Sequence, residues 1–387
     1  MNLLEQTKEI TTQSIGRAEA LPFASYHEPD YFFEEQRKIF SRDWVFVCME
    51  ANIANPGDYH AVNIAGEPIV VIRGQDGALR AMSNVCRHRG VVMLQGSGTA
   101  KNVVCPYHAW TYSDQGQLKA IPHPGDVSID KASHCLPQFT LDTLHGLVFV
   151  SLNPDVPPLQ ERYKGMEKYL AHYRVAEFQH SLPIDVDQWQ TNWKLPMENF
   201  VEGYHFFAVH KNTVETVAAT RDCFYVEGHA DWSITAGKQL DYPATLRDWL
   251  RGKGNEVHYL SICFPPNLVC NLYDGYITWA RVLPTGAGST EIATGYAAIQ
   301  DYKVSKSIDS IGKKIITEDK QICELAQLGT QSRRTKGGRL VEMERAVVDF
   351  HQYLGKMMFG KDHSRHFRAD NAGLFDGSTD KNAAKAV

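Results

Sequence analysis

Two short segments of the chain each combine one cysteine with one histidine, and this pairing constrains the fold more than any other feature. The first segment is Cys86-x-His88, and the second, after sixteen residues, is Cys105-x-x-His108. Thiolate sulfur and imidazole nitrogen are ligands that soft and borderline transition metals prefer. The pattern therefore predicts two loops that lie side by side, each presenting one thiolate and one imidazole to a common centre.

Three interpretations of these loops are open. A Rieske-type [2Fe–2S] cluster needs this arrangement, because two cysteines hold one of its irons and two histidines hold the other. A structural zinc site often takes both cysteines from one loop and both histidines from another, whereas here each loop carries one of each. Chance would leave two buried cysteines and two core histidines. The alternating order favours the [2Fe–2S] cluster.

Length and composition describe an ordinary multidomain globular protein. A single core rarely grows to 387 residues, so two or more domains are expected. The net charge of −5 argues against a nucleic-acid partner. No apolar run approaches the roughly 20 residues that a membrane helix needs, and the N-terminus does not resemble a secretory signal. We expect a protein of the cytoplasm without a membrane partner.

The distribution of apolar, polar and turn-forming residues along the chain predicts three regions. Residues 1–40 form an N-terminal helical segment that packs on the last domain, with a helix over residues 28–41 capped by Asp30. Residues 41–153 contain short β-rich runs separated by Gly, Pro, Asn and Asp turns, which is typical of a small all-β domain. This domain contains both Cys/His loops, and a proline-rich linker follows it.

Residues 154–387 mix helical and strand-like patterns. Helices are expected over residues 159–174 and 305–329, and the tail from about Ala369 is expected to be loosely ordered. An antiparallel sheet with helices on one side, an α+β domain, accounts for this mixture. The expected strands span residues 259–264, 268–272, 276–283 and 291–299.

A second candidate metal site lies in the last domain, at Glu202-x2-His205-x4-His210. Two histidines and one carboxylate on one face of Fe(II), with the other positions open, suit O2 activation. On an ideal helix His205 and His210 would lie about 140° apart, so the helix must break or bulge between them if they share a metal. By itself the H-x4-H spacing fits two core or surface histidines equally well.

Residues 86–90 and 105–112 resemble the Rieske domain of ring-hydroxylating oxygenase α subunits, and residues 192–210 resemble the iron-binding stretch of that family. The resemblance extends from the N-terminal helix to about residue 335. It implies an α+β fold with a small all-β Rieske [2Fe–2S] domain and a larger catalytic domain of the helix-grip type. It also implies functional residues. The cluster ligands are Cys86, His88, Cys105 and His108, and two ligands of a mononuclear Fe(II) are His205 and His210.

The same resemblance implies roles for two acids. The acid three residues before His205 is a bridge between subunits in the family, so Glu202 links His108 of one chain to His205 of the next. Many relatives carry Asp at that position. The third iron ligand of the family is an Asp five residues before a Glu on a C-terminal helix, and this spacing selects Asp319.

Two other acids of that helix, Glu318 and Glu324, are expected to form a solvated patch. Gly203 and Phe206 stand where relatives that act on quaternary amines usually carry cysteine. The substrate therefore stays open between a quaternary amine, an arene and a natural-product intermediate.

The resemblance implies a terminal oxygenase that uses O2 to hydroxylate or oxidatively demethylate a small organic molecule. No G-x-G-x-x-G motif follows a strand, so electrons from NAD(P)H are expected through a separate reductase, with or without a ferredoxin. A homotrimer is the expected assembly. The alternative functions are an electron-transfer-only Rieske protein and an iron or redox sensor.

Overall fold

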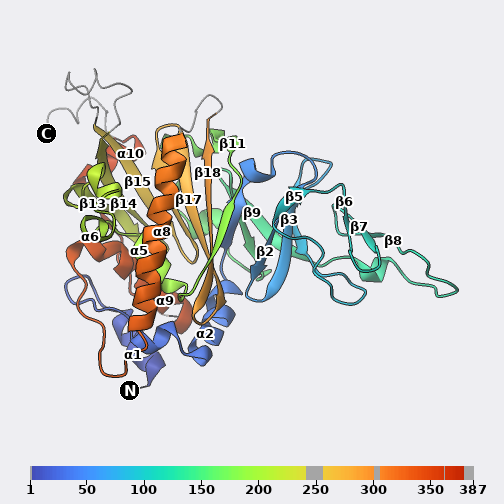
Figure 1. Cartoon of the computed structure of the whole chain (residues 1–387), viewed down its shortest axis with the longest axis horizontal. Coiled ribbons are helices and arrows are strands. Elements are labelled where there is room, and N and C mark those ends of the chain that lie inside the picture. The colour runs from blue at the N-terminus through green and yellow to red at the C-terminus, as the bar shows by residue number, and fades with distance from the viewer. Residues whose placement is uncertain (1, 241–255, 300–305, 361, 379–387) are drawn as a thin grey trace.

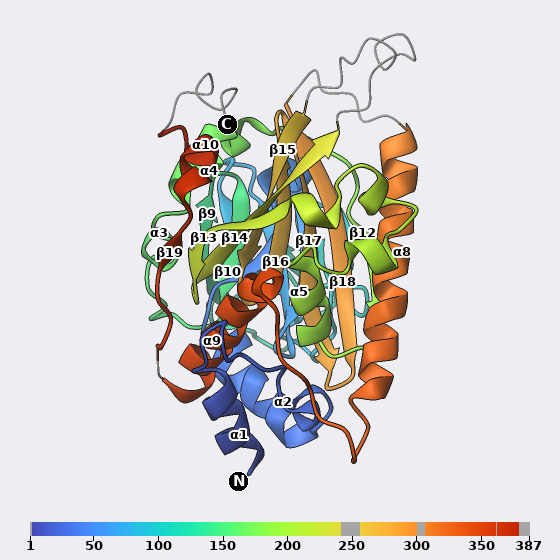
Figure 2. The same cartoon turned by 90° about the vertical axis from the view of Figure 1, so that its left-hand side faces the viewer.

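The computed structural model describes residues 2–240, 256–299, 306–360 and 362–378. Its strands form a β lobe with a seven-stranded and a three-stranded sheet, and a second lobe built on a nine-stranded sheet (Figure 1). Figure 2 shows that α5, α8 and α9 lie on one face of the nine-stranded sheet, while β9 and β10 of the β lobe lie behind it. The large sheet is thus the middle layer of the molecule.

The β lobe is antiparallel throughout its described strands. The order of the seven-stranded sheet is β1-β10-β9-β4-β3-β2-β5, and β6-β7-β8 form the smaller sheet. Ala65 and Gly66 both have positive φ, at 51° and 86°, which gives the tight turn that suits the β2–β3 hairpin. The strands are β1 (Val45–Met49), β2 (Asp58–Ile64), β3 (Glu67–Arg73), β4 (Leu79–Ser83), β5 (Ser97–Thr99), β6 (Asn102–Val104), β7 (Thr111–Ser113), β8 (Leu118–Ala120), β9 (Gln138–Leu144) and β10 (Leu147–Ser151).

The second lobe carries the long antiparallel sheet. Its order is β11-β18-β17-β16-β15-β14-β13-β19, and β12 also pairs with β18. The four predicted strands of this lobe are present, with ends shifted by up to three residues. The strands are β11 (His180–Ser181), β12 (Asp185–Trp189), β13 (Cys223–His229), β14 (Trp232–Leu240), β15 (Glu256–Phe264), β16 (Leu268–Tyr273), β17 (Tyr276–Gly286), β18 (Ser289–Ala298) and β19 (Phe367–Arg368).

Helices α5, α8 and α9 lie on the face of the large sheet away from the β lobe (Figure 2), whereas α3 packs on β9 of the β lobe. No helix in the described part of the chain is both long and apolar enough to cross a membrane. The α-helices are α1 (Leu3–Ile10), α2 (Pro29–Glu35), α3 (Leu159–Arg162), α4 (Glu167–His172), α5 (Lys194–Phe200), α6 (Phe206–Val209), α8 (Lys306–Gly329), α9 (Arg345–Phe359) and α10 (Gly373–Asp376). Shorter turns are η1 (Phe23–Tyr26), η2 (Gln36–Phe40), η3 (Glu50–Ile53), η4 (Ala132–His134), η5 (Val175–Glu177), η6 (Val214–Thr216), η7 (Thr220–Asp222), η8 (Glu342–Glu344) and η9 (Asp370–Ala372).

The two lobes share a continuous core. The Phe46 ring of β1 lies 5.6 Å from that of Phe149 on β10 and 5.2 Å from that of Trp279 on β17, in edge-to-face contacts. The fully buried side chain of Asn267 also exchanges two hydrogen bonds with the backbone of Phe46, at 2.9 and 3.0 Å. Because these contacts are buried and partly polar, they fix the direction in which the β lobe leaves the large sheet.

Three expectations need correction. Asp30 does not cap a helix, because Pro29 already occupies the first helical position and Glu28 precedes it; the helix continues as the wider turn η2. The expected helix over 159–174 is interrupted, since Gly165 has a φ of 93° between α3 and α4. Residues 370–376 are not loose, because α10 buries Phe375. The remainder of the expected loose tail, from residue 379, lies outside the described residues.

The N-terminal segment is joined to the second lobe by a buried ion pair. Nζ of Lys194, at the start of α5, lies 2.6 Å from Oε1 of Glu35 on α2, and neither side chain is exposed. Lys194 also donates to the Ser25 carbonyl, and Trp193 Nε1 donates to Glu35.

The boundaries of the predicted regions, at residues 40 and 153, stay predictions.

Replacing Glu35 should destabilise the protein strongly, because it leaves a buried ammonium without its partner. We expect Glu35→Ala to cost about 3–5 kcal/mol, measured as a lower thermal midpoint and a lower midpoint in denaturant. The neighbouring Glu34 provides the control, since it pairs with Arg37 and Lys38 at the surface and surface pairs contribute little. Equal losses in Glu34→Ala and Glu35→Ala would contradict this role of the pair.

Candidate metal centres

The segment that follows β12, residues 190–192, is held to the long helix α8 by hydrogen bonds. The backbone N–H of Asn192 donates to Oε1 of Gln327 at 2.8 Å, and that of Gln190 donates to Oε1 of Glu324 at 2.9 Å. The hydroxyl of Thr191 donates to the carbonyl of Cys323. Because α5 begins directly after this segment, these bonds fix the register of α8 against α5 and the turns that follow it.

Two histidines lie at the ends of α6. His205 immediately precedes this helix, and His210 follows it with φ −102° and ψ 29°, which is no longer helical. The predicted break therefore falls where α6 ends, without a bulge between the histidines. The two imidazole centroids lie 5.1 Å apart, so both rings face the same space.

Asp319 of α8 completes a group of three. Its Oδ1 lies 3.0 Å from Nε2 of His210 and 3.6 Å from Nε2 of His205. One ligand atom from each of the three residues lies within 4.8 Å of the others. Ligands of one metal at about 2.0–2.2 Å stand at such separations from each other. The structure thus brings together the three predicted iron ligands, which are separated by up to 114 residues.

Each of these histidines also contacts an outer carboxylate. Nδ1 of His205 lies 2.6 Å from Oε1 of Glu202, and Nδ1 of His210 lies 2.8 Å from Oε2 of Glu318. If each Nδ1 donates its proton to the carboxylate, the lone pair of each Nε2 points toward Asp319. Such carboxylate–histidine pairs orient metal-binding imidazoles and raise their basicity.

The three residues fit a divalent metal. Oδ1 of Asp319 is buried and accepts no hydrogen bond in the described structure, which is costly for a carboxylate unless a cation satisfies it. Burial lowers the pKa of His210, but the carboxylates of Asp319 and Glu318 outweigh burial and raise that pKa above its usual value. The site therefore favours a positive charge. Two histidines and one aspartate form a donor set that suits Fe(II).

The prediction that Glu318 and Glu324 form a solvated patch is wrong. Glu318 binds His210 and also accepts from the hydroxyl of Thr213 at 2.6 Å, and Glu324 accepts from the backbone of Gln190. The sequence contained one usable signal for Glu318. A metal-binding histidine needs an orienting partner for its second nitrogen, and Glu318 directly precedes the proposed ligand Asp319.

The two Cys/His loops have nearly the same backbone design. The N–H of Gly90 donates to the carbonyl of Cys86 at 3.0 Å, and that of Ala109 donates to the carbonyl of Cys105, also at 3.0 Å. Gly90 and Ala109 both have positive φ, at 75° and 56°. Each cysteine N–H then bonds a carbonyl five residues later, that of Val91 or Trp110. Two matching loops thus present matching ligand pairs.

The side chains of these loops suit a two-iron cluster. Cys86 and Cys105 are 2% and 3% exposed, whereas His88 and His108 are exposed, with ring centroids 4.8 Å apart. Within the described residues, these four are absent from the groups whose ligand atoms converge tightly enough for one ion. An inner thiolate pair and an outer imidazole pair fit a [2Fe–2S] cluster with one iron per pair better than they fit a single zinc ion.

Two aromatic residues beside the cluster loops were not predicted as site residues. The phenol of Tyr112 lies 3.5 Å from Sγ of Cys86 and accepts from the backbone of Arg87 at 3.0 Å. The Trp110 ring stacks on His88 at 4.7 Å with planes 5° apart. Hydrogen bonds to cluster sulfurs and burial tune the reduction potential. Trp110 and Tyr112 follow His108 by only two and four residues, so their proximity to the loops is the signal that was missed.

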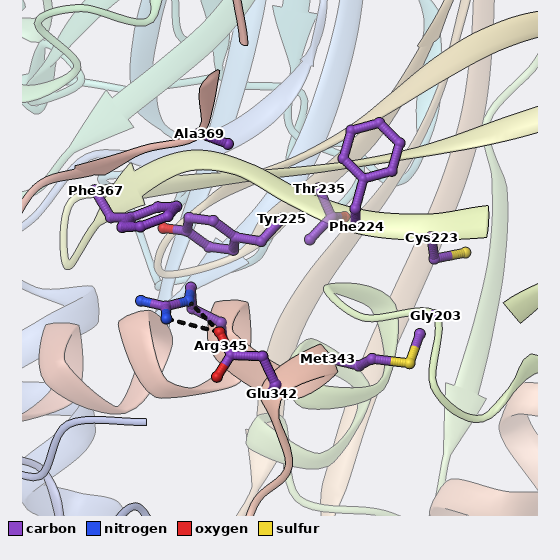
Figure 3. Close-up of a pocket in the computed structure, with 10 residues that line it drawn as sticks. All are labelled: Gly203, Cys223, Phe224, Tyr225, Thr235, Glu342, Met343, Arg345, Phe367 and Ala369. Carbon is purple, nitrogen blue, oxygen red and sulfur yellow. Dashed lines mark hydrogen bonds and ion pairs between the residues drawn. The ribbon is translucent and has the colours of Figure 1, made fainter. Parts of the chain in front are cut away.

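A cavity of about 270 Å³ opens next to the segment that carries His205 and His210 (Figure 3). Its wall includes Gly203, Cys223, Tyr225, Arg345 and Phe367. A Cβ placed on Gly203 would lie 2.7 Å from Sγ of Cys223, so a larger residue does not fit there without a shift. The thiol of Cys223 thus occupies the space that a side chain at position 203 would need.

Removing one proposed iron ligand should empty one metal site and spare the other. We expect Asp319→Ala to lose the mononuclear iron, so that iron per chain falls from three to two while the visible spectrum of the cluster is unchanged. Gln321→Ala, at an exposed position on the same helix, is the matched control and should keep three irons. Full iron occupancy in purified Asp319→Ala would assign the third ligand to another residue.

Comparisons with known proteins agree with both centres. Residues 43–139 match the family model of the Rieske [2Fe-2S] domain, and residues 161–360 match the ring hydroxylating alpha subunit (catalytic domain). The chain is 26% identical over 385 residues to the glycine betaine monooxygenase oxygenase subunit of Chromohalobacter salexigens, covering 88% of this chain and 86% of that protein. It is 30% identical over 365 residues to the carnitine monooxygenase oxygenase subunit of Escherichia coli K12, covering 87% and 93%.

A solved structure shows the same fold. A quaternary ammonium Rieske monooxygenase superposes with a TM-score of 0.79 at 23% identity, covering 91% of this chain and 98% of that one. The predicted fold class, a small all-β Rieske domain plus a larger α+β domain, is confirmed. The assignment also favours an oxygenase over an electron-transfer-only protein or a sensor, because both family models match in one chain. The chain belongs to the ring-hydroxylating alpha subunit family and is the terminal oxygenase component of a Rieske [2Fe–2S], non-haem iron oxygenase.

Proposed function

We propose that this oxygenase acts on a small quaternary amine and removes an N-methyl group by hydroxylating it. The observation that carries the oxygenase chemistry is the convergence of His205, His210 and Asp319. Fe(II) held by these three residues would supply O2 activation. Two relatives that match over most of the chain are named for glycine betaine and carnitine, which supports the quaternary-amine class. An arene or a natural-product intermediate is the second candidate.

We propose that Cys86, His88, Cys105 and His108 hold the cluster and that a separate NAD(P)H-dependent reductase, with or without a ferredoxin, reduces it. The exposure of both histidines supports this, since electrons must reach the cluster from outside. A cytoplasmic location remains the expectation from the sequence. The eight cysteines are all free, which is compatible with a reducing compartment.

We further propose a homotrimer in which electrons cross between subunits. In Figure 1 the sheet β6–β8, next to the Cys/His loops, and α6, next to the histidines of the iron site, lie at opposite sides of the molecule with the large sheet between them. Head-to-tail contacts between opposite sides close into a ring when the rotation permits. Such a ring places the cluster of one subunit beside the iron site of the next.

Glu202 is suited to connect the two centres. Its carboxylate accepts from Nδ1 of His205 at 2.6 Å and keeps 10% of its side-chain surface exposed. An ionised carboxylate can accept on both oxygens. Oε2 of Glu202 already accepts from the backbone N–H groups of Tyr204 and His205. Of the roughly four lone-pair sites of an ionised carboxylate, one on Oε1 is therefore left for a charge-assisted hydrogen bond from His108 of the partner subunit.

The substrate class is testable with purified oxygenase, a compatible reductase and 18O-labelled O2. Glycine betaine and carnitine are expected to give O2 uptake with stoichiometric formaldehyde, because a hydroxylated N-methyl group loses its carbon as formaldehyde. His210→Ala is the control and should show no substrate-dependent uptake. Labelled product from an arene and none from the amines would change the substrate class while the oxygenase function stands. Failure of every substrate with both metal sites full would overturn the proposed function.

The bridge is tested by Glu202→Gln. The amide has only one accepting oxygen, so we expect electron transfer from the reduced cluster to slow by about 10- to 100-fold at unchanged iron content. Glu318→Gln is the matched control: it weakens the carboxylate on the other histidine but lies off the proposed route, so electron transfer is expected to slow less than in Glu202→Gln. Stopped-flow absorbance of the cluster measures the rate, and sedimentation measures the assembly. Wild-type rates in Glu202→Gln, or a stable active monomer, would contradict the intersubunit route.

A further inference from the structure

Four tyrosines form a continuous row across four neighbouring strands of the large sheet. Tyr259, Tyr273, Tyr276 and Tyr296 lie on β15, β16, β17 and β18. The ring centroids of successive tyrosines lie 6.0, 4.4 and 5.6 Å apart. The middle pair, Tyr273 and Tyr276, is stacked with planes only 6° apart. The aromatic contact is therefore unbroken from one side of this row to the other.

The row lies on the face of the sheet that the iron-site helices cover. Residues an even number apart on a strand share a face, so Tyr259 shares its face with Cys263 and Tyr273 shares its face with Val269. Cys263 and Val269 are directly paired, and Cys263 is also paired with Ser233 of β14. Thr235, two residues along β14 on the same face, donates its hydroxyl to the carbonyl of Val201, the residue that caps the end of α5. The tyrosines therefore lie on the same face of the sheet as α5 and the segment that carries His205 and His210.

The first tyrosine approaches the neighbourhood of the iron site through Cys223, which lies beside Gly203 and Phe206. The phenol oxygen of Tyr259 lies 3.6 Å from Sγ of Cys223. A Cβ on Gly203 would lie 2.7 Å from that sulfur and 3.2 Å from the ring of Phe206. The Phe206 ring is 4.9 Å from that of His205. Cys223 is thus the oxidisable side chain that joins the tyrosine row to the surroundings of the proposed iron ligands.

We propose that Cys223 and Tyr259 carry oxidising equivalents away from the iron site to the stacked pair Tyr273 and Tyr276, as a route that protects the enzyme. This inference rests on the proposed function only in that O2 activation without a bound substrate supplies the oxidant. That oxidant takes one electron and one proton from the Cys223 thiol. The resulting thiyl radical takes one electron and one proton from Tyr259, which restores the thiol and leaves a tyrosyl radical.

The remaining steps repeat this exchange along the row. The Tyr259 radical regains an electron and a proton as Tyr273 or Tyr276 loses them, so one radical is carried outward and no side chain is consumed. Burial raises the pKa of the Cys223 thiol to about 11, so the thiol is neutral and releases its electron and proton together. Two such radicals are finally reduced by two small-molecule thiols, which form one disulfide.

The stacked pair is a suitable end point. Tyr259 is only 8% exposed, whereas Tyr273 and Tyr276 are partly exposed, so a dissolved reductant reaches them more easily. Without this exit, the oxidant attacks the nearest side chains, and thiol oxidation beyond the reversible stage inactivates a site permanently.

The test uses the iron-loaded holoenzyme without organic substrate, treated either with reductant and O2 or with hydrogen peroxide. Freeze-quenched samples are examined by EPR, with one batch carrying ring-deuterated tyrosine, and oxidised residues are mapped by peptide mass spectrometry. We expect a radical signal that narrows with deuterated tyrosine, and oxidation marks at Tyr273 and Tyr276. Peroxide supplies the oxidant without turnover, so this test is readable even if the substrate proposal fails.

Tyr259→Phe keeps the aromatic packing but cannot be oxidised at that step. We expect it to lower the tyrosyl signal about tenfold and to move the oxidation marks to Cys223 and Phe206. Tyr163→Phe, which alters a buried tyrosine outside the row, should behave like the wild type. Tyr273→Phe provides a second interruption if Tyr259→Phe folds poorly. Unchanged radical yield and unchanged marks in both row variants would show that the row only packs the sheet, and would overturn the inference.

Discussion

The hydrogen bonds between the end of β12 and α8 are the interactions on which the iron site depends. Asn192 and Thr191 are fully buried, and each binds a position on α8, at Gln327 and Cys323. The turns that carry the two histidines follow this anchor along the chain, while Asp319 lies four residues before Cys323 on α8. If α8 shifted by one helical turn, the buried donors of residues 191–192 would lose their acceptors on α8. Each unsatisfied buried donor would cost free energy. The third ligand is positioned by this penalty.

Charge is the second organising constraint of the site. Three carboxylates contact the two imidazoles: Glu202 and Glu318 on the outer nitrogens, and Asp319 between the inner ones. A buried cluster of this composition is stable only if a cation neutralises it. The same arrangement leaves one carboxylate, Glu202, between the iron site and the outside of the subunit. In the proposed route, metal binding and electron supply would both use His205.

The two metal centres lie on opposite sides of the large sheet. The Cys/His loops lie at the far end of the β lobe, and the large sheet stands between them and α6 (Figure 1). The sheet presents one face to the β lobe through Phe46 and Trp279 and the other to the helices that hold the iron site. The large sheet therefore separates the two centres within one chain. The tyrosine row lies on the face of the sheet that the iron-site helices cover.

The sequence by itself determined what depends on short spacings. It located both Cys/His loops, the histidine pair and the strands β15 to β18, because those patterns involve residues within one loop, turn or strand. It also selected Asp319, because the family resemblance supplied a spacing, Asp five residues before Glu, that only this position on the helix meets. Tertiary structure alone decided the rest. Glu318 holds His210, Cys223 fills the space beside Gly203, and four tyrosines on four strands make one row. The interacting residues of each set come from elements distant in sequence, and their contacts depend on helix register and strand pairing, which local periodicity does not encode.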